Sequence, residues 1–162
     1  MKKLLFLTVL LSFATVNLIA QDADKPAAHS DAMGPMAIFT NYKDMKWQKI
    51  LPDLGDNSPE ICVLHVDAKT KATKLIIRCP KAIHIRKHWH TGNETHTIIA
   101  GKATFACDGK KVEQDVGSFN FLPGKMVHEG WVSDNSIAFI TVDTAWDVNW
   151  VEGPPTAADL TK

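Results

Sequence analysis

Residues 87–101 read KHWHTGNETHTIIAG and place three histidines and one glutamate within nine residues. Because successive side chains of a strand point to opposite faces, His88 and His90 share one face. The TGN sequence that follows predicts a turn, and after it Glu94 and His96 share a face again. Imidazole nitrogens and carboxylate oxygens suit divalent first-row metal ions. The stretch therefore predicts two strands joined by a turn, with side chains that converge on one metal ion.

The alternative for these histidines is a solvated strand edge, because an isolated His-x-His pair is more often exposed than bound to a metal. The fixed spacing to Glu94 favours the metal site, and so does a later histidine, His128, which follows the sequence PGKMV. His96 has two interpretations. It is either a base or alternative ligand beside the metal, or a core histidine bonded to the backbone, and the second is the more common situation.

Short strands separated by turns account for most of the chain after residue 36. Stretches such as EICVLHVD (60–67) and SIAFITV (136–142) are rich in β-branched residues, which favour strands. The Asp108-Gly109 pair is typical of a β-hairpin turn. No ten-residue stretch after position 20 has a convincing helical period. The pattern predicts an all-β sandwich or barrel, with strands near residues 60–67, 74–79, 84–90, 95–99, 101–107, 110–114, 118–122, 126–132 and 136–142.

The N-terminal residues have the pattern of a secretory signal peptide. Lys2 and Lys3 precede an apolar run that becomes less dense toward Ala20. A membrane anchor needs roughly 20 apolar residues, and this run is shorter and interrupted by polar side chains. We expect a signal peptide at residues 1–20, a disordered linker at 21–35, one domain at 36–152 and a C-terminal tail at 153–162. The mature protein would be periplasmic or secreted and not bound to a membrane.

The charge balance and the cysteines restrict the remaining function classes. The chain has 18 basic and 18 acidic residues, and removal of the signal peptide would leave a slight acidic excess. This balance gives no reason to expect nucleic acid or an anionic membrane as a partner.

Cys62, Cys79 and Cys107 can form at most one internal disulfide, and the sequence does not select the pair. Small buried apolar side chains are the favoured interpretation of all three.

The histidine-rich stretch and the residues around His128 resemble the two motifs of the cupin superfamily. The first motif, G-x5-H-x-H-x3,4-E-x6-G, matches at His88, His90, Glu94 and Gly101, and the second, G-x5-P-x-G-x2-H-x3-N, matches at Gly117, Pro123 and His128. Ala82, Lys125 and Val132 depart from the motifs at positions that are not metal ligands in the family. The His-Trp-His and Pro-x-x-Met-x-His sequences also resemble small exported single-domain bacterial cupins of unassigned chemistry.

This resemblance implies a double-stranded β-helix, the cupin jelly-roll barrel, with one metal ion in its mouth. Carried over by position, the ligands would be His88, His90, Glu94 and His128. The ion would be one divalent transition metal, Fe, Mn, Ni, Cu or Zn, because the ligand types do not select among them. Glu94 would also be the candidate catalytic base. By analogy with small cupins, the chain would form a homodimer through exposed sheet edges.

The resemblance further implies a mononuclear-metal enzyme, dioxygenase-like, that acts on a small oxygenated organic molecule. Two alternatives remain open: a non-catalytic cupin that binds a metal or small ligand, and an oxygen-independent metal-dependent lyase or isomerase. Candidate residues of the substrate pocket lie near the motifs, although exposed strand charge or barrel packing would explain the arginine and the apolar side chains equally well. These candidates are His96, Arg86, Phe121, Met126 and Trp131.

Overall fold

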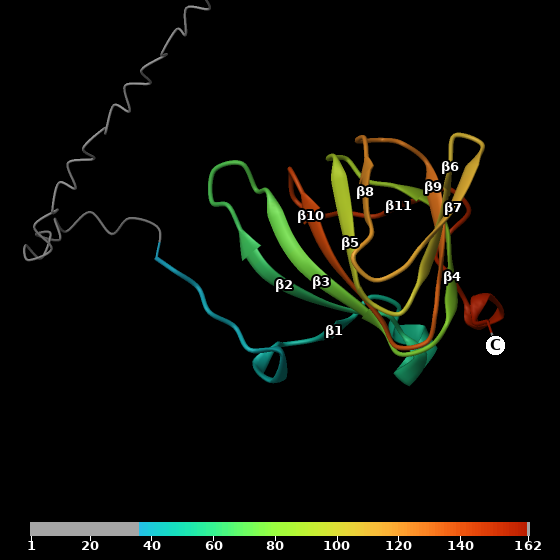
Figure 1. Ribbon diagram of the computed structural model, residues 1–162, viewed down its shortest axis with the longest axis horizontal. Coiled ribbons are helices and arrows are strands. Elements are labelled where there is room, and N and C mark those ends of the chain that lie inside the picture. The colour runs from blue at the N-terminus through green and yellow to red at the C-terminus, as the bar shows by residue number, and fades with distance from the viewer. Residues whose placement is uncertain (1–35, 162) are drawn as a thin grey trace, which may run out of the picture. The chain divides into compact units, whose positions relative to one another are not determined.

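Alternating apolar and polar residues form two antiparallel β-sheets in the computed structural model of this protein (Figure 1). The structure describes residues 36–161, so the predicted signal peptide and linker lie outside the described residues. Residues from Phe39 onward form one unit. Its strands are β1 (Gln48–Lys49), β2 (Glu60–Val66), β3 (Thr73–Cys79), β4 (Ile83–Trp89), β5 (Glu94–Ala100), β6 (Ala103–Cys107), β7 (Lys110–Gln114), β8 (Phe119–Leu122), β9 (His128–Val132), β10 (Ser136–Val142) and β11 (Asn149–Trp150).

The described helices are short 3₁₀ turns: η1 (Tyr42–Asp44), η2 (Pro52–Asn57) and η3 (Ala157–Asp159). None of the helices in the described range is long or apolar enough to span a membrane.

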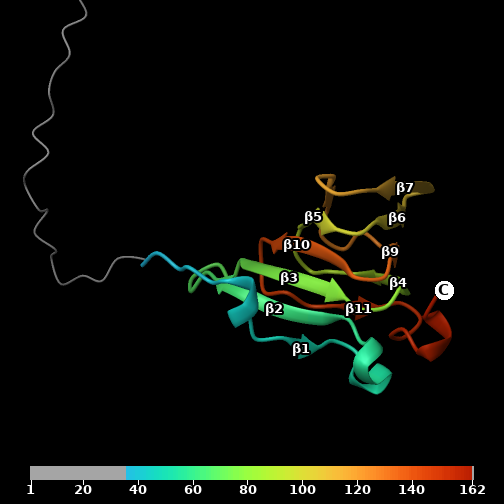
Figure 2. The same cartoon turned by 60° about the horizontal axis from the view of Figure 1, so that its bottom comes forward.

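The two sheets have the strand orders β1-β2-β3-β10-β5-β8 and β11-β4-β9-β6-β7. From β3 onward the chain passes from one sheet to the other at almost every connection, and only β6 and β7 are joined as a hairpin within one sheet. Figures 1 and 2 show the two sheets facing each other around an interior. This is the double-stranded β-helix, so the predicted all-β jelly-roll fold is confirmed.

The turn at residues 91–93 joins the two sheets. β4 pairs with β9, whereas β5 pairs with β10 and β8 in the other sheet. The inward-pointing residues of β4 and β5 therefore face each other across the interior. His128, at the start of β9, pairs directly with His88 of β4. This topology brings the two sequence motifs together.

Apolar side chains from both sheets fill much of the interior. One cluster contains Leu51, Leu54, Cys79 and Ile83, and a second contains Ile61, Leu75, Ile140 and Val142. Burying one leucine or isoleucine stabilises a fold by roughly 1.5–3 kcal/mol. These clusters hold the strands that carry the histidines in fixed positions.

The residues predicted to form a C-terminal tail contact β4. Leu160 forms a β-bridge with Ile83, and the amide of Thr161 donates a hydrogen bond of 2.9 Å to the carbonyl of Ala82. Asp159 forms an ion pair with Arg86, with 2.7 Å between Oδ2 and Nη2. The C-terminal segment thus covers part of the outer face of β4.

The three cysteines lie in the described range and form no disulfide. Cys62 and Cys79 are buried, and Cys107 is half-buried. Burial raises the pKa of the Cys79 thiol to about 12, so this side chain is neutral and unreactive at physiological pH. For these two residues the structure agrees with the interpretation as buried apolar side chains.

Gly101 should be essential to the connection between β5 and β6, and Gly117 offers a matched control. Both have positive φ, +71° and +87°. A Cβ at Gly101 would lie 2.9 Å from Cα of Ser136, whereas one at Gly117 would meet nothing within 4 Å. Gly117→Ala should cost roughly 1–2 kcal/mol from its backbone conformation alone. Gly101→Ala should cost clearly more in urea unfolding, and equal losses would contradict this account.

Candidate metal centre

Three buried imidazoles form a cluster between the sheets. His88 lies on β4, His90 is the first residue after β4, and His128 is the first residue of β9. One nitrogen from each ring lies within 4.8 Å of the others, close to the separation of ligands that share one metal ion. The ring centroids of His88 and His128 are 4.2 Å apart, as expected for residues paired across two neighbouring strands.

Backbone carbonyls fix the orientation of each of these rings. Nδ1 of His88 lies 2.7 Å from the carbonyl oxygen of Arg86, and Nδ1 of His128 lies 3.0 Å from that of Met126. Nδ1 of His90 contacts the carbonyl of Asp147 in the same way. A carbonyl only accepts hydrogen bonds, so Nδ1 carries the proton in each neutral ring. Each Nε2 therefore presents a lone pair, the state in which histidine binds a metal.

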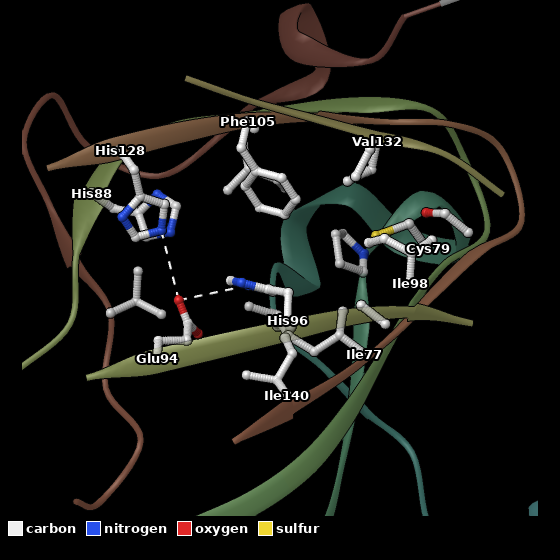
Figure 3. A pocket seen from close by; sticks show the side chains of 18 of the residues that line it. Ile77, Cys79, His88, Glu94, His96, Ile98, Phe105, His128, Val132 and Ile140 are labelled. Carbon is white, nitrogen blue, oxygen red and sulfur yellow. Dashed lines mark ion pairs between the residues drawn. The ribbon is translucent and has the colours of Figure 1, made fainter. Parts of the chain in front are cut away.

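The carboxylate of Glu94 faces this cluster from the opposite sheet (Figure 3). Its Oε2 atom lies 3.1 Å from Nε2 of His90, 3.7 Å from Nε2 of His128 and 3.6 Å from Nε2 of His96. The side chain is 2 % exposed, and Oε2 accepts no hydrogen bond from the described residues. While the imidazoles are neutral, this buried carboxylate oxygen faces nitrogen lone pairs, which is unfavourable, and a cation between them removes the conflict. The residues present thus fit a divalent metal ion.

The protonation states also suit metal binding. Burial lowers the pKa of His88 to about 3 and lowers that of His128, so both rings are neutral at pH 7. Burial acts in the same direction on His90, but the adjacent Glu94 outweighs it and the pKa of His90 is raised. Burial alone would raise the pKa of Glu94, but the imidazoles of His96 and His90 together lower it to about 2. Glu94 is therefore ionised throughout the physiological range.

The cluster forms one wall of a cavity of about 110 Å³. Most of the remaining wall is apolar, and Figure 3 shows these side chains around the space beside His96 and Glu94. They include Ile77, Ile98, Phe105, Val132 and Ile140. A cavity with a polar cluster on one side and apolar walls elsewhere is typical of a site for a small organic ligand.

Of the predicted pocket residues, His96 lines this cavity and Arg86 does not. Strict alternation along β4 would place Arg86 on the face of His88, but the register of β4 is irregular between Ile85 and His88. Ile85 and His88 both line the cavity, although strict alternation would put them on opposite faces. Arg86 instead points outward to Asp159.

Phe121, Met126 and Trp131, which were expected near the pocket, are also absent from the cavity wall. On β8 the inward position is that of Leu122, and Phe121 is 54 % exposed. On β9 the inward positions begin with His128, so Trp131 lies on the outer face and stacks on His84 at 4.6 Å. Met126 precedes β9 and contributes its carbonyl to the orientation of His128.

Two tryptophans near the C-terminus line the cavity, and the sequence analysis did not assign them to it. The ring centroid of Trp150 lies 5.1 Å from that of His88, and that of Trp146 lies 6.3 Å from that of His90. The strand β11 has only two residues, so there is no alternation from which its inward face could be inferred. The one available signal for a site role was the presence of two large aromatic residues after the last predicted strand, 136–142.

Comparisons with known proteins identify the family and agree with the fold. Residues 35–154 match the family described as the ChrR cupin-like domain. Among solved structures, KdgF from Halomonas sp. is 12% identical, and the match covers 67% of this chain and 94% of that chain with a TM-score of 0.56. An RmlC-like cupin from Shewanella frigidimarina is 15% identical, and the match covers 68% and 93% with a TM-score of 0.57.

A chain from the crystal structures of the DMSP lyases RdDddP and RnDddQII is 12% identical, and the match covers 67% of this chain and 63% of that chain with a TM-score of 0.58. At these identities the likeness extends to the fold alone. The comparison with curated proteins gave no match.

Removal of one imidazole should reduce metal binding without unfolding the barrel. We expect His128→Ala to lower the transition-metal content of the purified protein markedly, because the variant loses a ligand that begins a strand at the cavity. His84→Ala is the matched control, since His84 lies on β4 but contacts Glu129 outside the cavity. Elemental analysis and circular dichroism would measure the two effects. Unchanged metal content in His128→Ala would remove the basis for this site.

The metal-free protein should lose stability in mild acid through His88. The unfolded chain binds a proton at this residue near its ordinary pKa of 6.5, whereas the folded chain does so only near pH 3. The free energy of unfolding should therefore fall as pH decreases through this window, by up to about 1.4 kcal/mol per pH unit for one proton. Urea unfolding between pH 6 and 4.5 should show a shallower pH dependence for His88→Gln than for the wild type. Equal slopes would contradict the burial argument.

Proposed function

Because this chain belongs to the ChrR cupin-like family, we propose that it is a mononuclear-metal enzyme that acts on a small oxygenated organic molecule. The observation that supports the proposal is the unpaired carboxylate oxygen of Glu94, which faces imidazole Nε2 atoms on the wall of an apolar cavity. A purely structural core would gain nothing from this arrangement, because each of these polar groups would be desolvated without a partner.

The residues present can divide the work of such a reaction. His88, His90 and His128 would hold the ion, which when bound supplies Lewis acidity toward an oxygen of the substrate. The apolar walls exclude water and accommodate the hydrocarbon part of the substrate. A substrate with one oxygen-bearing end and an apolar remainder, such as an enol, a diketone or a phenol, matches this division of the cavity.

Glu94 has two roles to combine. It is ionised at neutral pH, as a general base must be, but a pKa of about 2 makes it a weak base. Metal ligation is therefore the role that its surroundings favour. Proton transfer would require the carboxylate to move away from the imidazoles that stabilise its charge.

The reaction that we favour is dioxygenase-like, an oxygen-dependent cleavage of the substrate. An oxygen-independent lyase or isomerase could use the same donors, and the fold is shared with a chain from structures of DMSP lyases. A non-catalytic binding protein is the remaining alternative. Oxygen dependence and turnover distinguish the three.

We further propose that the protein is exported to the periplasm or secreted, and that it forms a homodimer. The basic and apolar N-terminal residues support export. Phe119 and Phe121 support association, because both are more than half exposed on β8, an edge strand of the six-stranded sheet.

A substrate screen would test the proposed activity. The full chain, loaded separately with Fe(II), Mn(II), Ni(II) or Cu(II), should consume oxygen in the presence of a short-chain diketone, enol or phenol, whereas the redox-inactive Zn(II) form should not. His128→Ala should lose this activity together with its metal, whereas His84→Ala should retain both. If Glu94 also transfers a proton, Glu94→Gln should lower kcat by about 10²–10⁴-fold.

Turnover of the same compounds without oxygen would replace the dioxygenase assignment with the lyase or isomerase. Stoichiometric metal without turnover of any compound in air or under nitrogen would contradict the enzyme proposal and leave the binding protein.

A further inference from the structure

His96 lies outside the three-histidine cluster but is buried in the same cavity. It is an inward-facing residue of β5, two positions after Glu94. Its Nδ1 atom lies 2.9 Å from Oδ1 of Asn120, and its Nε2 atom lies 3.6 Å from Oε2 of Glu94. Figure 3 shows the tip of the ring pointing into the space between Glu94 and His128. The ring is thus held on one side and faces the metal ligands on the other.

A chain of hydrogen bonds determines which nitrogen of His96 carries the proton. It begins at the backbone carbonyl of Phe119, which can only accept, so the amide group of Gln114 must donate to it, at 2.9 Å. The oxygen of Gln114 then accepts from the amide nitrogen of Asn120 at 2.7 Å. This leaves the oxygen of Asn120 facing Nδ1 of His96, so Nδ1 donates. In the neutral ring, Nε2 is therefore an unprotonated acceptor.

An unprotonated Nε2 cannot donate to the carboxylate that it faces. Its lone pair and Oε2 of Glu94 lie 3.6 Å apart in a buried site, where their mutual repulsion is poorly screened. A cation between the two atoms converts this repulsion into attraction. Ligand atoms about 2.0–2.2 Å from one ion are at most about 4.3 Å apart, so the separation permits a shared ion.

We propose that His96 is a further imidazole ligand, so that four histidines and Glu94 hold the metal ion. The inference rests on the metal centre of the proposed function and adds a donor that lies outside both sequence motifs. Oε2 of Glu94 is within 3.7 Å of Nε2 of His90, His96 and His128, so each of these nitrogens can share an ion with this oxygen.

A fifth protein donor changes what the centre can accept. A six-coordinate ion would keep one open position, so a substrate would bind through a single atom. A ligand that binds through two oxygens would have to displace His96 or Glu94. His96 therefore restricts the substrate as well as holding the metal.

Nitrogen NMR of the full-length wild-type protein tests the proposal directly. The protein would be labelled with ¹⁵N in histidine and titrated with Zn(II). Each ring would be assigned from the variant in which that one histidine is replaced. The ¹⁵N shift of an imidazole nitrogen changes on zinc coordination, so Nε2 of His96 should move together with the Nε2 signals of His88, His90 and His128. His84, outside the cavity, is the internal control and should not move.

Zinc affinity provides the second measurement. Chelator competition should show a Kd that is more than about 100-fold higher for His96→Ala than for His84→Ala, because loss of a partner outside the ligand shell alone costs about 10–100-fold. Asn120→Leu, which removes the partner of Nδ1 but no ligand, should weaken binding less. It also tests the hydrogen-bond chain if His96→Ala does not fold.

The outcomes separate the two proposals. If the His88, His90 and His128 signals shift and that of His96 does not, His96 is not a ligand and this inference is overturned, even if its variant binds zinc more weakly. If no histidine signal shifts, the metal centre itself is wrong and the proposed function loses its basis.

Discussion

The buried negative charge of Glu94 is the constraint to which the rest of the site conforms. A carboxylate removed from water requires a compensating positive charge. Backbone carbonyls accept hydrogen bonds from Nδ1 of His88 and His128, so Nε2 of each neutral ring carries a lone pair and no proton. A bound ion supplies the positive charge that a proton on His90 would otherwise provide. Both sheets contribute to this arrangement, because Glu94 lies on the six-stranded sheet and His88 and His128 lie on the five-stranded sheet. The centre is therefore complete only when both sheets are in place.

The distribution of cations strengthens this requirement. Both arginines of the chain lie away from the cavity wall, since Arg78 pairs with Glu60 at 2.6 Å and Arg86 pairs with Asp159. No guanidinium is therefore available to neutralise Glu94 or to bind the carboxylate of a substrate. The carboxylate of Glu94, which raises the pKa of His90, attracts a cation and disfavours a multiply charged anion.

The sequence located the site residues whose spacing along the chain matches a metal-binding motif. His88, His90 and Glu94 lie within one short stretch, and a second motif pointed to His128, which β9 places beside His88. The all-β architecture followed from the strand pattern and from the resemblance to cupins.

The positions that the sequence did not predict depend on the pairing register of the strands. The irregularity between Ile85 and His88 reversed the expected face of Arg86, and no feature of the local sequence indicates it. The partner of His96 is Asn120, 24 residues away, and the two meet only because β5 and β8 pair in one particular register.

One contact links the centre to the end of the domain. The ring of His90 is oriented by the carbonyl of Asp147, and the neighbouring Trp146 and Trp150 cover the histidines. A nascent chain that ends before these residues would contain every proposed ligand but would lack the group that orients one of them. Full assembly of the centre would consequently report that the segment around β11 has joined the barrel.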